Sequence, residues 1–297
     1  MSTSLDGQVV VISGGGRGLG RAFALDLAAR GARLVVNNRN RVVDDQGLGP
    51  ADHVVAEIKA MGGEAVAEHG DVTDPATASN VVRLALDTWG RVDACITSAA
   101  VSGPAMFHKT SPEAFETVIR TNVLGSSQIA SACSAVMREQ RHGRIVLVSS
   151  AAGLHGEPTV SAYAASKGAL ISLGKTIAFE GASRGVFTNV LLPYATTQMT
   201  DAGMDPRYRD VMDAAAVAPV VAALVSPSST LNGQVIVTAG GGLRVATSVE
   251  WGTVPLTSGA DDPAELASLL EASRKGPAHE YLHAQDGFQD FAEELTT

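Results

Sequence analysis

Short apolar runs alternate with longer segments of helical period along most of this chain, and this alternation limits the possible folds more than any other feature. The first run, at 8–13, leads through a glycine-rich turn to Leu19, Phe23 and Leu27 at helical spacing. Comparable runs follow at 33–37, 92–97, 144–150, 186–192 and 234–239. Continuous apolar strands separated by helices indicate a parallel sheet covered on both faces. We therefore expect an α/β protein with a doubly wound parallel sheet, the Rossmann fold.

The sequence changes character after Gly242. Residues 243–297 carry prolines, scattered acids and one weakly periodic stretch, which predicts a single helix at about 262–275 with irregular structure around it. We expect a dinucleotide-binding catalytic domain over residues 5–242, followed by an extension over 243–297 that serves as a lid or a subunit contact.

The charge of the chain excludes some classes of partner. A net charge of −9 and a pI of about 5.2 leave no basic stripe for nucleic acid. The first residues lack a cationic segment followed by a long apolar one, and no apolar run is long enough to span a bilayer, so we expect a cytoplasmic protein. Cys95 and Cys133 have no partner at metal-ligand spacing, and we predict no metal site.

A glycine-rich turn follows the first expected strand and opens the first expected helix. Its glycines have the spacing Gly14-x3-Gly18-x-Gly20, with Gly16 and Arg17 between them. Glycines let a backbone turn sharply and approach a pyrophosphate, and a helix N terminus offers free N–H groups and a positive dipole end. The position of this turn therefore predicts a dinucleotide site.

Residues after the second and third βα steps bear on the choice of dinucleotide. Asn38 and Arg39 stand where NAD sites usually carry a carboxylate, whereas a 2′-phosphate calls for arginine. Arg17 can join Arg39 around such a phosphate, so NADP is favoured, with NAD as the alternative if Asn38 binds the ribose. Asp71 is expected to accept a hydrogen bond from the adenine amino group.

Tyr163 and Lys167 stand four residues apart in a segment of helical period, so both project from one helix face. An ordinary phenol is a poor base at neutral pH, and a neighbouring ammonium group lowers its pKa by stabilising the phenolate. Ser150 ends the expected strand at 144–150 and can supply a hydroxyl to a carbonyl oxygen whose charge changes. The three residues indicate acid–base chemistry on an alcohol or ketone.

These motifs carry a resemblance to a known family. SGGGRGLG, GDV, TNVLG, Ser150 and YAASK occur in order over roughly residues 5–242, as in the classical short-chain dehydrogenases/reductases. The resemblance implies that Ser150 binds the substrate oxygen and that Tyr163 transfers the proton. It implies that Lys167 lowers the pKa of the tyrosine and holds the nicotinamide ribose, while Asn122 orders a proton-relay water.

The resemblance also implies the remaining contacts to the dinucleotide and the assembly. The expected cofactor residues are Gly14, Gly16, Arg17, Gly18, Leu19, Gly20, Asn38, Arg39, Asp71, Val72, Ser98, Ala99, Tyr163, Lys167, Pro193 and Thr196. By the same resemblance, helices at about 112–141 and 161–184 form the interface of a homodimer or homotetramer.

Two segments of the chain depart from the family pattern. One lies in the expected cofactor site, and the other indicates a particular branch of the family. TSAA at 97–100 replaces the usual NNAG at the end of the expected strand 92–97, and Tyr194 replaces a glycine expected beside the nicotinamide. Residues 193–200 and the start of the tail are similar to the dehydrogenase domain of peroxisomal multifunctional enzyme type 2 and to hydroxysteroid-dehydrogenase-like bacterial relatives.

Three functions remain open at this point. The tail favours a 3-hydroxyacyl-CoA or hydroxysteroid dehydrogenase. The arginines favour an NADPH-dependent carbonyl or 3-ketoacyl reductase of the fatty-acid or polyketide type. The TSAA segment leaves room for a regulator that binds a dinucleotide without catalysis, although an intact Ser-Tyr-Lys-Asn set argues for chemistry.

Overall fold

The computed structural model of this chain describes residues 4–39, 43–197, 205–208 and 210–296. Contacts divide the chain into two compact units, Met1–Val245 and Ala246–Thr297. Within the described residues, no helix combines the length and the hydropathy that a membrane crossing requires.

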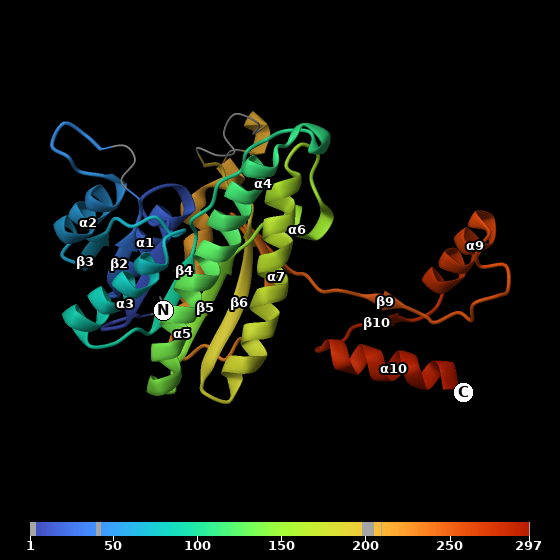
Figure 1. Ribbon diagram of the computed structural model, residues 1–297. Helices are drawn as coiled ribbons and strands as arrows, with labels where there is room; N and C mark the ends of the chain where they lie inside the picture. The colour runs from blue at the N-terminus through green and yellow to red at the C-terminus, as the bar shows by residue number, and fades with distance from the viewer. Residues whose placement is uncertain (1–3, 40–42, 198–204, 209, 297) are drawn as a thin grey trace. The chain divides into compact units, whose positions relative to one another are not determined.

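The larger unit is built on one sheet of eight strands in the order β3-β2-β1-β4-β5-β6-β7-β8 (Figure 1). Seven of these strands pair in parallel: β1 (Val9–Ser13), β2 (Arg33–Asn37), β3 (Glu64–Glu68), β4 (Ala94–Thr97), β5 (Gly143–Val148), β6 (Val186–Pro193) and β7 (Val235–Ala239). The strand order reverses direction at β1, as in a doubly wound sheet, so the expected α/β Rossmann fold is confirmed.

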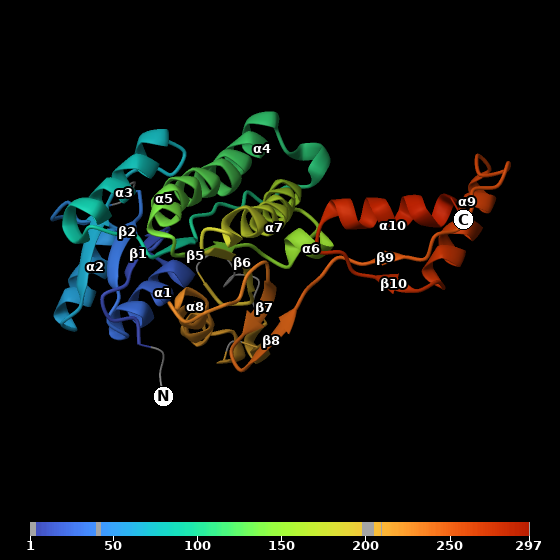
Figure 2. The same cartoon turned by 90° about the horizontal axis from the view of Figure 1, so that it is seen from below.

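Helices cover both faces of this sheet (Figure 2). The apolar side chains of α1 (Gly18–Ala29), α2 (Pro50–Ala60) and α8 (Ala218–Val225) pack with one face. Those of α3 (Pro75–Trp89), α5 (Ser126–Gln140) and α7 (Ser161–Ala182) pack with the other. Helix α4 (Pro112–Ile119) continues through a π-helical turn (Arg120–Gly125) into α5, and the short α6 (Ala152–His155) precedes α7. The strands are therefore buried on both sides, which explains their continuous apolar sequences.

The last strand of the sheet differs from the others. Strand β8 (Gly242–Val245) runs antiparallel to β7, with Ala239 paired to Gly242. The division into two units falls after β8, because the residues of β8 pair with the sheet.

Short 3-10 turns lie in the loops of the larger unit, at Phe107–Lys109, Pro206–Tyr208, Asp210–Met212 and Ala214–Val217.

The smaller unit contains a two-stranded antiparallel ribbon and two helices. Strands β9 (Glu250–Trp251) and β10 (Ala278–His279) pair with each other. Helix α9 (Pro263–Arg274) matches the expected helix at about 262–275. Helix α10 (Ala284–Thr296) was not expected, and the prediction of irregular structure there is wrong. Its apolar residues Phe288, Phe291 and Leu295 recur at helical spacing among acids.

Candidate active site

The glycine turn holds two backbone segments very close together at the carboxyl end of the sheet. Gly14 has a φ of +68°, and a Cβ atom added there would lie 2.6 Å from Ala99 Cα. A Cβ on Gly20 would overlap the carbonyl oxygen of Gly14, and one on Gly16 would lie 2.6 Å from Pro50 Cβ. The turn therefore accepts only glycine at these positions without a backbone shift.

Helix α1 begins directly after this turn, at Gly18. Its N-cap residue is Arg17, which is exposed and makes no side-chain cap hydrogen bond, and the first turn contains no acid. Leu19 packs against the hydrophobic core and fixes the start of the helix. The positive end of the helix is therefore available to an anionic group such as a pyrophosphate.

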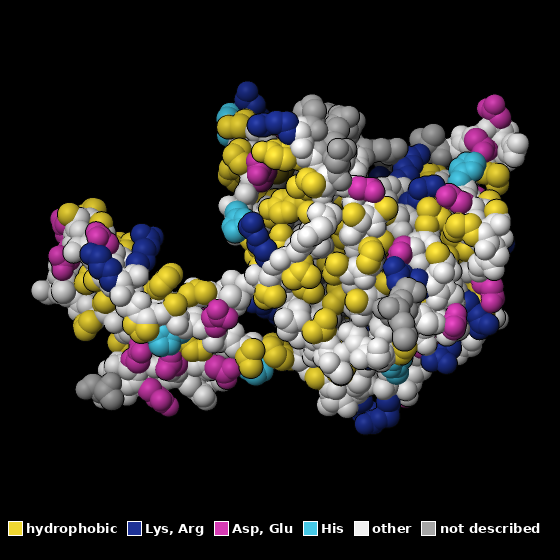
Figure 3. Space-filling view, turned by 180° about the vertical axis from the view of Figure 1, so that it is seen from behind, with side chains coloured by type: hydrophobic (Ala, Val, Ile, Leu, Met, Phe, Trp, Pro, Cys, Tyr) yellow, Lys and Arg dark blue, Asp and Glu magenta, His cyan; other side chains and the backbone are white. Residues whose placement is uncertain are grey.

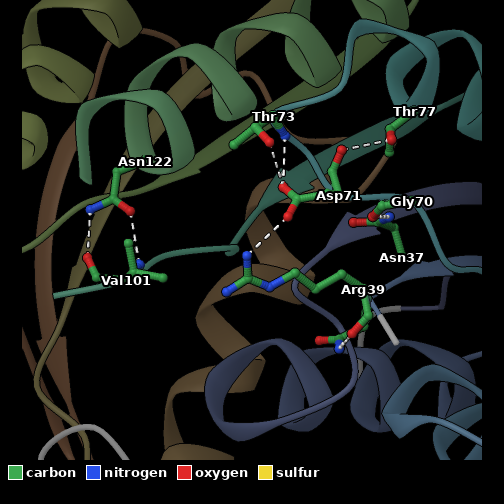
Figure 4. Close-up of polar contacts among 9 residues, drawn as sticks. Asn37, Arg39, Gly70, Asp71, Thr73, Thr77, Val101 and Asn122 are labelled. Carbon is green, nitrogen blue, oxygen red and sulfur yellow. Dashed lines mark hydrogen bonds and ion pairs between the residues drawn. The ribbon is translucent and has the colours of Figure 1, made fainter. Parts of the chain in front are cut away.

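At the next two strand ends, the residues expected around the adenosine contact one another (Figure 4). Arg39 Nη1 donates to Asp71 Oδ2 over 2.9 Å, and Asn38 Nδ2 donates to the carbonyl oxygen of Arg39. Burial raises the pKa of Asp71, but the Thr73 N–H, Arg39 and the Thr73 hydroxyl outweigh it, so this pKa lies below its ordinary value. Asp71 is therefore a carboxylate at neutral pH.

Val72 has its side chain turned to the interior. It is 6% exposed and belongs to the hydrophobic core, and a Cβ on Gly125 would lie 2.6 Å from Val72 Cγ2. The Val72 side chain thus packs in the core, and an expected cofactor contact at this position would come mainly from its backbone atoms.

The departure at 97–100 changes the polar groups beneath the turn. Ser98 N donates to the carbonyl oxygen of Ser13 over 3.0 Å, which ties the end of β4 to the end of β1. The buried hydroxyls of Ser13 and Thr97 have no hydrogen-bond partner among the described residues. Ala99 is partly exposed beside Gly14, so its methyl group stands at the edge of the expected cofactor site.

Pro193 ends β6, and Thr196 follows it in the adjoining loop. Thr196 N donates to the carbonyl oxygen of Met212 over 2.6 Å. Its hydroxyl oxygen is buried and has no partner among the described residues, whereas Tyr194 is half exposed. Residues 198–200 of this segment lie outside the described residues.

A nicotinamide dinucleotide fits the residues along this edge. The turn at Gly14 leaves room for a close approach, α1 begins without a side-chain cap, and Thr196 aims an unpaired hydroxyl from a buried position. Buried polar groups are normally paired, so the unpaired hydroxyl of Thr196 favours a polar ligand.

Lys167 lies below Tyr163 on α7. Lys167 is 3% exposed, and its Nζ donates to the carbonyl oxygen of Val148 over 2.8 Å. The same nitrogen lies 5.5 Å from the centre of the Tyr163 ring. Burial lowers the pKa of Lys167 to about 8, because the charged form loses its hydration.

Tyr163 is partly buried. Burial raises the pKa of Tyr163 above its ordinary value, and the nearby Ser150 side chain offsets this only in part. The pKa of Tyr163 in this state is thus raised, not lowered, and the stabilisation of its phenolate by Lys167 stays a prediction. The ammonium group is directed at Val148 rather than at the hydroxyl, so desolvation dominates and Tyr163 is a protonated acid in this state.

Ser150 lies two residues beyond the end of β5, not at the end of the strand as expected. Its Oγ accepts a hydrogen bond from Ala152 N over 3.2 Å at the start of α6. The Ser150 side chain therefore lies near the phenol of Tyr163, whose ring lies over the buried Lys167 ammonium group.

Asn122 lies within the π-helical turn between α4 and α5 (Figure 4). Its Oδ1 accepts from Val101 N over 2.8 Å, and its Nδ2 donates to Val101 O and to Ser166 Oγ, each over 2.9 Å. Both amide hydrogens are thus used to clamp the loop after β4 and the helix that carries Tyr163. The relay-water role of Asn122 stays a prediction.

Ser166 is a site residue that the sequence reasoning missed. It is fully buried, receives the Asn122 amide, and its hydroxyl donates to the carbonyl oxygen of Tyr163 over 2.7 Å. Its position between Tyr163 and Lys167 in the sequence could have indicated a role for Ser166. The peptide group of Val101, which completes the hydrogen-bond network of Asn122, Ser166 and Tyr163, belongs to no motif.

The buried ammonium group leads to a test by pH. Between pH 8 and 10.5 the unfolded chain binds more protons at Lys167 than the folded protein, so the free energy of unfolding should rise with pH there. Below pH 8 the full cost of burying the charge is present. Relative to Lys167→Met, the wild type should gain roughly 3 kcal/mol across this window. The free energy of unfolding is measured by urea denaturation at each pH. The same pH dependence in the two proteins would contradict the buried charge.

The comparisons with known proteins agree with this geometry. Residues 8–207 match the family model described as short chain dehydrogenase. The chain is 38% identical over 236 residues to a short-chain type dehydrogenase/reductase of Mycobacterium tuberculosis, covering 79% of this chain and 82% of that protein. It is 35% identical over 263 residues to peroxisomal multifunctional enzyme type 2 of Drosophila melanogaster, covering 88% of this chain and 44% of the enzyme.

Among solved structures, a short chain dehydrogenase from Mycobacterium avium superposes with a TM-score of 0.79 at 34% identity. The match covers 92% of this chain and 98% of that chain. It extends beyond the sheet into the smaller unit, while the chain spans less than half of the Drosophila enzyme.

Proposed function

The chain belongs to the short-chain dehydrogenase/reductase family and is an NAD(P)-dependent oxidoreductase acting on CH–OH groups, and we propose that its substrate is a 3-hydroxyacyl-CoA thioester or a hydroxysteroid. The observation that carries the chemistry is the position of the Tyr163 ring over the buried Lys167 ammonium group, with the Ser150 side chain near enough to affect the phenol. The substrate class is supported by the similarity to peroxisomal multifunctional enzyme type 2 over 88% of this chain.

In the reducing direction, the two hydroxyls act on one oxygen atom. The Ser150 hydroxyl donates a hydrogen bond to the substrate carbonyl oxygen, and the Tyr163 hydroxyl transfers its proton to the same atom as negative charge develops there. The nicotinamide cofactor supplies or accepts the hydride. The raised pKa of Tyr163 suits it to remain protonated until the carbonyl oxygen gains charge.

Lys167 acts on the ring of Tyr163, and Asn122 acts on the backbone that carries it. The Lys167 ammonium group lies under the ring and stabilises the phenolate left by proton transfer. Asn122, through Ser166, fixes the helix turn that carries Tyr163. In the oxidising direction the same groups receive the proton.

A second candidate is an NADPH-dependent carbonyl or 3-ketoacyl reductase. Arg39, which stands where an NAD site usually carries an acid, favours it because a guanidinium group matches a 2′-phosphate. NADP is accordingly the proposed cofactor of either activity, with NAD as the alternative.

Turnover of acetoacetyl-CoA and of 17-ketosteroids with NADPH and with NADH separates these proposals. The first proposal expects the higher kcat/KM with the thioester or the steroid, measured by nicotinamide absorbance. The second expects NADPH-dependent reduction of simple ketones and acyl-carrier thioesters at a higher kcat/KM. Cofactor binding without turnover on any ketone or alcohol would remove both.

The smaller unit is proposed as a subunit contact in a homodimer or homotetramer. Of its described residues only Gly252 and Gly287 are fully buried, while α9 and α10 expose apolar side chains (Figure 3). These are Leu266, Leu270, Phe288, Phe291 and Leu295, each at least 43% exposed. A unit that buries so little needs a further surface. We expect one sedimenting species of two or four chains, and a monomer would contradict this.

The cytoplasmic location stays a prediction. Several relatives are peroxisomal enzymes by name, so related domains serve in an organelle as well.

A further inference from the structure

Arg39 and Asp71 extend from neighbouring strands and bind each other. Arg39 follows β2 and Asp71 follows β3, and these strands pair in parallel from Arg33 with Glu64 to Asn37 with Glu68. The Arg39 and Asp71 side chains are 33% and 31% exposed, so the pair is partly shielded from water (Figure 4). Arg39 and Asp71, two of the residues expected at the adenosine end, thus form one unit.

Asp71 is the fixed member of this pair. Its Oδ1 accepts from Thr73 N over 3.0 Å and from Thr73 Oγ1 over 2.9 Å. Its carbonyl oxygen accepts from Thr77 Oγ1 over 2.7 Å, and the neighbouring Gly70 carbonyl accepts from Asn37 Nδ2 over 2.9 Å. The carboxylate is therefore held in place by its own loop, whether or not Arg39 is bound.

Arg39 is the movable member. Its side chain is long and has several rotatable bonds, and among the described residues its hydrogen bond to a carboxylate uses only Nη1. A guanidinium group forms its best anion contacts through two parallel N–H bonds, so a phosphate within reach offers Arg39 a stronger partner.

We propose that Asp71 determines cofactor preference by competing with a 2′-phosphate for the guanidinium of Arg39, an inference that rests on the proposed function. An NAD-type cofactor leaves the Arg39–Asp71 pair intact. An NADP-type cofactor draws Arg39 away from Asp71 or shares it with the carboxylate. Asp71 therefore opposes NADP while Arg39 favours it, and the balance of the two sets the ratio of affinities.

Dissociation constants for NADPH and NADH, measured by titration of the full chain in wild type, Asp71→Asn, Arg39→Ala and the double variant, test this competition. Loss of an adenine contact at Asp71 would weaken the binding of NADPH and of NADH by the same factor, so it cancels in the ratio of the two dissociation constants. We expect the ratio of the NADH to the NADPH constant to rise about threefold to tenfold in Asp71→Asn. In the Arg39→Ala background, Asp71→Asn should change this ratio by less than about twofold.

Glu64→Gln is the matched control, because it breaks the Arg33–Glu64 pair, 3.0 Å long, on the same two strands at their opposite ends. It should leave the ratio unchanged. Asp71→Ser repeats the test if the asparagine variant has a lowered Tm.

An unchanged ratio in Asp71→Asn, or an equal rise with and without Arg39, overturns the competition. Either result leaves the oxidoreductase proposal intact as long as the wild type binds a cofactor and turns over a ketone. Absence of any binding in the wild type would remove the proposed function instead.

Discussion

Tyr163→Phe is expected to lower kcat by about 10²- to 10⁴-fold while changing the cofactor dissociation constant little. The phenyl ring keeps the contact with the Lys167 ammonium group but loses the hydroxyl proton that passes to the substrate oxygen in the proposed reaction. The Ser150 hydroxyl is then left to bind the carbonyl oxygen alone. Steady-state turnover and a cofactor titration on the same preparation measure both quantities.

Phe179→Leu provides a control for this substitution, because it changes an exposed aromatic residue of the same helix, 43% exposed and outside the catalytic cluster. Its kcat should equal that of the wild type. A Tyr163→Phe enzyme within about threefold of wild-type kcat would show that proton transfer proceeds through another group.

Gly14→Ala is expected to lower both stability and cofactor affinity strongly. The new Cβ would lie 2.6 Å from Ala99 Cα, and the residue would keep a φ of +68°, which L side chains rarely adopt. Because the clash is between two backbone segments, the turn must move, and the pyrophosphate site moves with it. We expect cofactor affinity to fall more than about tenfold, and Tm to fall together with it.

Gly62→Ala separates the two causes. Gly62 has a φ of +82° and nothing within 4 Å of an added Cβ, so it carries the conformational cost without the clash. This variant should lose about 1 kcal/mol of stability and retain cofactor binding. If Gly14→Ala behaved in the same way, the close approach at Ala99 would have no role in the site.

The parts of the site that depend on regular geometry could be predicted from the sequence. Tyr163 and Lys167 are one helical turn apart, and a helix fixes the direction of such a pair wherever it packs. The glycine turn lies between a strand and a helix for the same local reason. The doubly wound sheet followed from apolar strands, since parallel sheets bury both faces.

The pairing of Arg39 with Asp71 could not be predicted in this way. It requires β3 to lie beside β2, and the sequence of β3, EAVAE, is short, carries an acid at each end and does not stand out as an apolar strand. Without that neighbour, the two residues were assigned separate contacts to the cofactor.

The pKa of Tyr163 also depends on information that spacing does not carry. The sequence places an ammonium group one turn away, but burial and the bond from Lys167 to Val148 determine how much of its charge reaches the hydroxyl. The π-helical turn at Asn122 is similar, because its role depends on the peptide group of Val101, 21 residues earlier.

The most direct test of the proposed chemistry is a single-turnover reduction of acetoacetyl-CoA by bound NADPH in weak buffer, with proton uptake and nicotinamide absorbance recorded together. Reduction of a ketone consumes one hydride and one proton. The account predicts that one proton is taken up per nicotinamide oxidised in the wild type, and that both signals slow together in Tyr163→Phe. Oxidation of the nicotinamide at the wild-type rate in Tyr163→Phe would contradict it.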